Sequence, residues 1–125
     1  MKMNEAKRRI LIAEENCAVR ETLADVLKTA DFDVIQARSG AQAVGLLNNP
    51  DPIDLLIADL RMSGLDGVEI AHHARGKYPE VPVLFMCTRL DLALVENVPD
   101  RHLYLRKPFR LRQLLRAVGS LLSRH

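Results

Sequence analysis

At residues 53–59 the sequence reads Ile53-Asp54-Leu55-Leu56-Ile57-Ala58-Asp59, an apolar run that ends in a carboxylate. Such a run, bounded by turn residues, is typical of a strand buried on both faces in a parallel sheet. Asp59 then lies at the carboxyl end of that strand, where open α/β sheets bind their ligands. The next residues, 60–67, permit a tight turn, and Asp66 is a suitable N-cap for a following helix. We therefore expect Asp59 to be rigidly held and open to reagents.

Strand and helix patterns alternate on both sides of this run. Short apolar runs predict four further strands, at residues 9–13, 32–37, 81–87 and 102–106. Apolar residues at spacings of three and four predict helices within residues 19–30, 39–47, 66–78 and 111–122. The stretch 89–98 has a mixed period and predicts no clear element. Five strands alternating with helices predict an α/β fold with a parallel sheet covered on both faces.

Composition limits the class of protein. With 125 residues, 48% of them hydrophobic and 27% charged, the chain fits a single domain over residues 1–125. Residues 1–8 are polar and are expected to form a flexible tail rather than a signal peptide. No apolar run is long enough to cross a bilayer, so we expect a cytoplasmic protein without a membrane partner. Cys17 and Cys87 are far apart and show no metal-ligand spacing, which predicts free thiols.

Positive charge is concentrated at the end of the chain. Residues 101–125 contain seven Lys or Arg and no acidic residue, whereas the first hundred contain eleven basic and sixteen acidic residues. Solvated arginines on an amphipathic helix explain this better than a nucleic-acid surface, because aromatic residues are not interleaved. Arg112 and Arg116 lie one helical turn apart and could meet acidic groups on a second copy, which leaves a homodimer open.

Residues with charged or reactive side chains lie at the ends of four of the predicted strands. These residues are Glu14-Glu15, Asp59, Cys87-Thr88 and Lys107. If the strands are neighbours, three carboxylates and an ammonium group converge at one edge of the sheet. Like charges brought together repel, and a hard cation such as Mg²⁺ is the usual remedy. Carboxylates, a metal ion and a lysine together indicate phosphoryl transfer to a carboxylate nucleophile.

In order and spacing, these residues resemble the receiver domain of two-component response regulators. The resemblance rests on the acid pair, on Asp59 with its 62–67 loop, and on Lys107-Pro108-Phe109. It implies a flavodoxin-like, doubly wound sheet of order 2-1-3-4-5. It also implies that Asp59 accepts phosphate from a histidine kinase or phosphotransfer protein and that Lys107, before a cis proline bond, pairs with a phosphoryl oxygen. Such a domain is a signalling module, not an enzyme with free substrates.

The same resemblance assigns the metal ligands. Mg²⁺ would be held by Glu14, Glu15, Asp59 and the backbone carbonyl of Arg61. The family usually has two aspartates, or Glu then Asp, where this chain has two glutamates, and the longer side chains predict weaker binding. Cys87 stands at the family's Ser or Thr switch position, with Thr88 next to it, and a thiol is a poorer hydrogen-bond donor than a hydroxyl.

Tyr104 matches the family's aromatic switch position. Output would pass to a downstream effector through the face made by the fourth helix, the fifth strand and the fifth helix. The segment between Thr88 and Tyr104 is short for the family, so we expect a reduced fourth helix. The alternative is a pseudo-receiver, a constitutive protein-interaction module in which two glutamates and Cys87 have eroded the chemistry. A small aspartyl hydrolase is disfavoured, because Arg61 stands where a second acid is needed.

Overall fold

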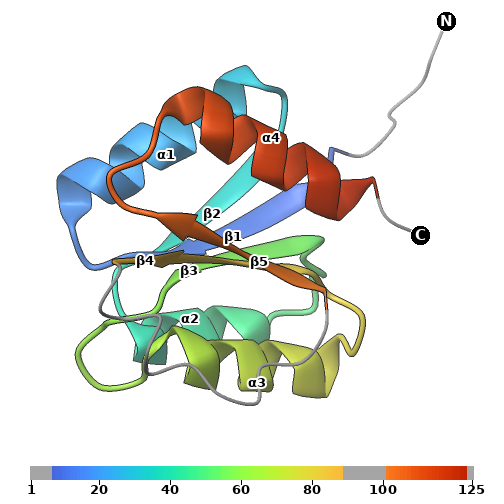
Figure 1. Cartoon of the computed structure of the whole chain (residues 1–125). Helices are drawn as coiled ribbons and strands as arrows, with labels where there is room; N and C mark the ends of the chain where they lie inside the picture. The colour runs from blue at the N-terminus through green and yellow to red at the C-terminus, as the bar shows by residue number, and fades with distance from the viewer. Residues whose placement is uncertain (1–6, 89–100, 124–125) are drawn as a thin grey trace, which may run out of the picture.

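A five-stranded parallel sheet lies between two layers of helices in the computed structural model, which describes residues 7–88 and 101–123 (Figure 1). The strands are β1 (Arg9–Ala13), β2 (Asp33–Ala37), β3 (Leu55–Asp59), β4 (Val83–Cys87) and β5 (His102–Arg106). The helices are α1 (Cys17–Thr29), α2 (Gly40–Leu47), α3 (Gly67–Lys77) and α4 (Leu111–Leu122). No helix in the described ranges is long and apolar enough to span a membrane.

The strand order is β2-β1-β3-β4-β5, which confirms the predicted flavodoxin-like order 2-1-3-4-5. β3 occupies the middle of the sheet, paired with β1 on one side and with β4 on the other. All four strand pairs are parallel, so the carboxyl ends of the strands share one edge of the sheet. The residues that follow β1, β3 and β5 therefore emerge close together.

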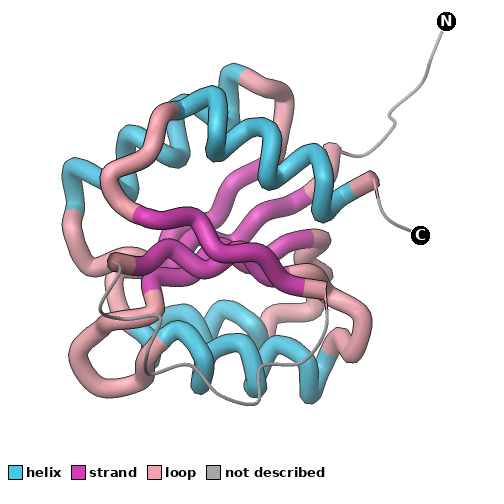
Figure 2. Tube along the Cα trace, viewed as in Figure 1, coloured by secondary structure: helices cyan, strands magenta, loops and turns pink. Residues whose placement is uncertain are grey.

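Each face of the sheet is covered by its own pair of helices. α1 and α4 pack on one face, and α2 and α3 pack on the other, as Figures 1 and 2 show. Successive strand residues alternate between the two cores, as the pleat requires. In β3, for example, Leu56 and Ala58 face α2 and α3, while Leu55 and Ile57 face α1 and α4. Burial on both faces explains why β3 is a continuous apolar run.

Three helices begin at side-chain caps. Asn16, Ser39 and Asp66 each accept a hydrogen bond from the backbone N–H three residues further on. The Asp66 cap is reinforced by Glu69, whose carboxylate accepts from the Asp66 backbone N–H at 3.0 Å. These caps fix where the chain turns from a strand end into a helix, and the predicted cap Asp66 is confirmed.

The predicted strands at 9–13 and 102–106 match β1 and β5, whereas the other three predicted strands were one or two residues too long at their amino ends. Ile53 and Val81 are buried, but they precede the strand ladder, so their apolar character reflects core packing and not strand pairing. Of the predicted tail, residues 1–6 lie outside the described residues, as does the stretch 89–98, where the expected reduced fourth helix would fall. Lys7 and Arg8 are described, and they contact Asp31 and the backbone carbonyl of Leu122, respectively.

Candidate functional site

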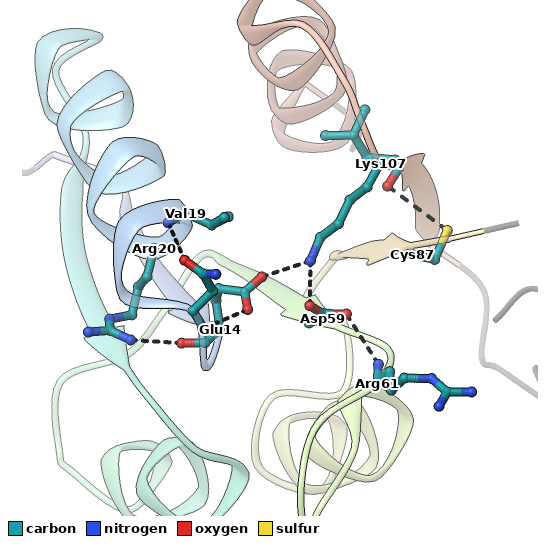
Figure 3. Close-up of polar contacts among 9 residues, drawn as sticks. Glu14, Val19, Arg20, Asp59, Arg61, Cys87 and Lys107 are labelled. Carbon is teal, nitrogen blue, oxygen red and sulfur yellow. Dashed lines mark hydrogen bonds and ion pairs between the residues drawn. The ribbon is translucent and has the colours of Figure 1, made fainter. Parts of the chain in front are cut away.

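Three charged side chains meet at the carboxyl edge of the sheet. Glu14 follows β1, Asp59 ends β3, and Lys107 follows β5. Lys107 Nζ donates to Asp59 Oδ2 at 2.6 Å and to Glu14 Oε1 at 3.0 Å, so one ammonium group bridges two carboxylates (Figure 3). We call these three residues the carboxylate–lysine cluster. The predicted convergence of groups from distant parts of the chain holds for this cluster.

Hydrogen bonds fix both the side chain and the backbone of Glu14. Its side chain is almost fully buried, and Oε2 accepts a hydrogen bond from the Asn16 backbone N–H at 3.0 Å. Its own N–H donates to the carbonyl of Ala37 in β2. Its carbonyl accepts from the Arg20 guanidinium at 2.9 Å, and Arg20 also donates to Gln36. Glu14 is therefore a carboxylate held in a fixed position and not a mobile surface group.

Asp59 is presented by a tightly packed loop. Its Oδ1 accepts from the backbone N–H of Arg61 at 3.2 Å, while Oδ2 contacts Lys107. α3 approaches so closely that a Cβ at Gly67 would lie 2.5 Å from the Asp59 carbonyl oxygen. A Cβ at Gly40 would lie 2.4 Å from the carbonyl oxygen of Leu65 in the same loop. Both glycines are needed for this packing, because no side chain fits at these distances.

The two carboxyl groups have different proton affinities. Burial, the largest effect, raises the pKa of Asp59, and the neighbouring Glu14 charge adds to it, although Lys107 opposes both. Burial also acts to raise the pKa of Glu14, but hydrogen bonds from Asn16 and Lys107 outweigh it and hold that pKa below its usual value. Burial would lower the pKa of Lys107, yet its two carboxylate partners raise it. Asp59 is therefore the first of the pair to take a proton, while Lys107 stays charged.

Glu15 is not part of the carboxylate–lysine cluster. Its side chain is directed to the loop after β3, where Oε2 accepts from the Ser63 backbone N–H at 3.1 Å. Across residues 7–88 and 101–123, no three His, Cys, Asp or Glu side chains form a group that could hold a metal ion. Glu14 and Asp59 still form a convergent oxygen pair, and one or two carboxylates with waters are what Mg²⁺ usually requires. The donor chemistry fits Mg²⁺ through this pair.

The remaining predicted residues lie on β4 and β5. Cys87 ends β4 with its side chain fully buried, and its Sγ is 3.9 Å from the carbonyl oxygen of Leu105 (Figure 3). Thr88 follows the strand and is exposed. Tyr104 stacks on Phe85, with ring centroids 5.5 Å apart, and stays 36% exposed. Burial is the largest cause that raises the pKa of Tyr104, and an electrostatic interaction with Cys87 adds to it.

Two residues that hold the site were missed from sequence. Asn16 both caps α1 and donates its N–H to Glu14; its position before an amphipathic helix was a usable signal for the cap. Arg20 reaches the Glu14 carbonyl and the side chain of Gln36 in β2, and no sequence pattern indicates such contacts. The Lys107–Pro108 peptide bond is cis, as predicted, and Cys17 and Cys87 are free thiols.

The chain is similar to a known protein family and to individual relatives. The model of the response regulator receiver domain matches residues 10–119. The chain is 34% identical over 122 residues to the uncharacterised transcriptional regulatory protein YrkP of Bacillus subtilis, covering 94% of this chain and 50% of that protein. It is 33% identical over 121 residues to the response regulator MprA of Mycobacterium tuberculosis, covering 93% and 51%, respectively. The chain thus spans about half the length of these curated relatives.

A solved structure has a similar fold. The response regulator receiver protein of Sinorhizobium medicae superposes with a TM-score of 0.85 at 32% sequence identity. The match covers 94% of this chain and 95% of that one. The likeness in fold therefore extends over nearly the whole chain.

Proposed function

The chain belongs to the response regulator receiver domain family, and on that premise we propose that it accepts a phosphoryl group on Asp59. The donor would be a phosphohistidine of a histidine kinase or phosphotransfer protein. The observation that carries the proposal is the placement of Asp59, whose carboxylate lies at the end of the central strand, 2.6 Å from the Lys107 ammonium. A cytoplasmic location fits such a donor.

The transfer can be written with these groups. A carboxylate oxygen of Asp59 attacks phosphorus, and a P–O bond forms as the P–N bond to the donor imidazole breaks. The imidazole nitrogen keeps the electrons of the broken bond and takes a proton from solvent water, and an acyl phosphate remains on Asp59. Lys107 would pair with a phosphoryl oxygen as charge develops there. The buried Glu14 keeps Lys107 directed toward Asp59.

Bound Mg²⁺ would neutralise phosphoryl charge during this transfer. Glu14 and Asp59 would hold it, together with the backbone carbonyl of Arg61. Glu15 would join them only by releasing the Ser63 N–H, to which it is bonded. This arrangement follows the family, with Glu14 in the place of the more usual acid pair.

The alternative is a pseudo-receiver, a constitutive protein-interaction module. Two observations favour it: Glu15 is engaged with a loop, and the residue at the switch position is a buried thiol. Both bear on metal binding and on relay to a partner. Neither removes Asp59 or Lys107, so phosphoryl acceptance remains the better-supported function.

Intact mass spectrometry separates the two functions. The protein is incubated with Mg²⁺ and acetyl phosphate, alongside Asp59→Asn and the control Asp25→Asn, which changes an exposed aspartate on α1. We expect one phosphoryl group on the parent and on the control, none on Asp59→Asn, and none when a chelator is present. No gain on the parent, under conditions that label an ordinary receiver, would establish the pseudo-receiver instead.

A further inference from the structure

Arg20 connects the first turn of α1 with the end of β1 and with the edge strand β2. Its guanidinium donates to the backbone carbonyl of Glu14 at 2.9 Å (Figure 3). The same guanidinium donates to the side-chain oxygen of Gln36 in β2 at 3.2 Å. The backbone N–H of Arg20 donates to the carbonyl of Asn16, the residue that caps α1. The backbone and the side chain of Arg20 are therefore both fixed by hydrogen bonds.

The positive charge of Arg20 is directed at neutral acceptors. Within residues 7–88 and 101–123, no ion pair joins its guanidinium to a carboxylate. Its acceptors are a backbone carbonyl and a side-chain amide, and the side chain is half-buried. A charged donor forms a stronger hydrogen bond to such an acceptor than a neutral donor does. Arg20 is therefore a strong restraint on the peptide group that joins Glu14 to Glu15.

This peptide group lies where the pairing of β1 with β2 ends. The N–H of Glu14 still donates to the carbonyl of Ala37, but the carbonyl of Glu14 accepts from Arg20 and not from a strand. The chain then leads to Asn16, whose N–H donates to Glu14 Oε2 at 3.0 Å. A rotation of the peptide after Glu14 would displace the Asn16 N–H and, with it, the carboxylate that this N–H holds.

We propose that Arg20 is a positioning residue for the Glu14 carboxylate and thereby sets the Mg²⁺ affinity of the oxygen pair of Glu14 and Asp59. This role rests on the proposed function, in which that pair holds the metal ion. Arg20 contacts the backbone of Glu14, so it acts on the metal through Glu14. Mg²⁺ requires nearly octahedral ligand geometry, and a displaced oxygen therefore weakens its binding.

The contact with Gln36 supplies a matched control. If Arg20 served only to tie α1 to the edge strand, that tie would depend on Gln36 as much as on Arg20. Gln36→Leu removes the tie and leaves the Glu14 carbonyl with its donor. Arg20→Met removes both contacts but keeps an unbranched side chain. Arg20→Lys keeps the charge and one donor group for the Glu14 carbonyl, without the planar fork of the guanidinium.

Binding of Mn²⁺ tests the proposal without phosphorylation. Mn²⁺ prefers the same oxygen ligands as Mg²⁺, and the electron paramagnetic resonance signal of the free ion gives its dissociation constant. We expect this constant to rise about tenfold in Arg20→Met, about threefold in Arg20→Lys and less than about twofold in Gln36→Leu. In NMR spectra of the metal-free proteins, the Asn16 amide resonance should move in Arg20→Met and stay near its parent position in Gln36→Leu.

Several outcomes would overturn the proposal. Unchanged Mn²⁺ affinity in Arg20→Met would do so, as would an equal loss in Gln36→Leu or the absence of Mn²⁺ binding by the parent. If circular dichroism shows that Arg20→Met does not fold, the other two variants decide. Weaker binding by Arg20→Lys than by Gln36→Leu supports the proposal, and any other order overturns it.

Intact mass after incubation with acetyl phosphate keeps this proposal separate from phosphoryl acceptance. A parent that binds Mn²⁺ in an Arg20-dependent way but gains no phosphoryl group would contradict acceptance alone. A parent that is labelled, and whose Mn²⁺ affinity does not depend on Arg20, would contradict only the positioning role.

Discussion

The carboxylate–lysine cluster and the β4–β5 pair, by which we mean Cys87 at the end of β4 and Tyr104 in the middle of β5, are built differently. In the cluster, Lys107 has two charged partners within 3.0 Å, and Glu14 is fixed by further backbone contacts. In the β4–β5 pair, Cys87 Sγ is 3.9 Å from a carbonyl oxygen, and Tyr104 is held by ring stacking.

This difference in construction corresponds to two functions that a receiver domain combines, phosphoryl acceptance and relay to a partner. Phosphoryl acceptance requires charges at fixed positions, and the cluster supplies them. Relay to a partner requires a group that moves when phosphate arrives, and a buried thiol is a weak donor for that purpose. If the chain accepts phosphate on Asp59 as proposed, acceptance and relay should be separable by substitution, and the following variants test that expectation.

The largest effect is expected from Lys107→Met. Without the ammonium group, two buried carboxylates face each other, and the pKa of each should rise. We expect the free energy of unfolding at pH 7 to fall by about 2 kcal/mol, less than the full cost of breaking a buried ion pair because Lys107 is partly exposed. Urea unfolding measures it, and phosphorylation by acetyl phosphate should be strongly reduced.

The pH dependence of the stability lost in Lys107→Met shows whether charge or packing is the cause. Carboxyl groups with raised pKa penalise the folded state while they are ionised, and the penalty disappears as the pH falls through the raised pKa toward the ordinary one. The deficit of Lys107→Met relative to the parent should therefore shrink between neutral pH and pH 4. Lys28→Met, an exposed lysine of α1, should stay within about 0.5 kcal/mol of the parent at both pH values. A deficit independent of pH would mean that lost packing, and not charge, explains the result.

An intermediate effect is expected from Cys87→Thr, which provides a hydroxyl at the end of β4. The Leu105 carbonyl oxygen is 3.9 Å from the present sulfur, beyond hydrogen-bond reach of a hydroxyl at that position, so burying the hydroxyl should lower the free energy of unfolding by about 1 kcal/mol. Relay should improve, seen as a larger change in Tyr104 fluorescence on phosphorylation. The chain has no Trp and two Tyr, so a Tyr78→Phe background reports Tyr104 alone. Equal fluorescence changes in that background with and without Cys87→Thr would show that the thiol does not limit relay.

The smallest effect is expected from Glu15→Ala. It removes one exposed contact to the Ser63 N–H, which should cost about 0.5 kcal/mol or less. The Mg²⁺ concentration that half-saturates phosphorylation should stay within about twofold, as should that of the control Glu80→Ala, because Glu14 and Asp59 form the oxygen pair. A rise of about tenfold or more would show that Glu15 leaves Ser63 and acts as a metal ligand.

The sequence was sufficient for the frame of the site but not for all of its contacts. Apolar periodicity predicted each described strand and helix, because burial on one or two faces leaves a period in the chain. Convergence of Glu14, Asp59 and Lys107 then followed from parallel strands that share an edge. The position of the Glu15 side chain could not be predicted. The sequence does not distinguish two adjacent glutamates, and Glu15 is placed by a tertiary contact, its hydrogen bond from the Ser63 backbone N–H.

The close packing at Gly67 and Gly40 sets a limit on how this edge can evolve. Positions 15 and 87 carry residues unlike those expected from the family resemblance, yet the fold is intact, so the side chains here tolerate exchange. A side chain at 67 or 40 would meet backbone atoms of the residues that present Asp59. A library randomised over this edge and selected for folding would thus return varied residues at the polar positions and glycine alone at these two.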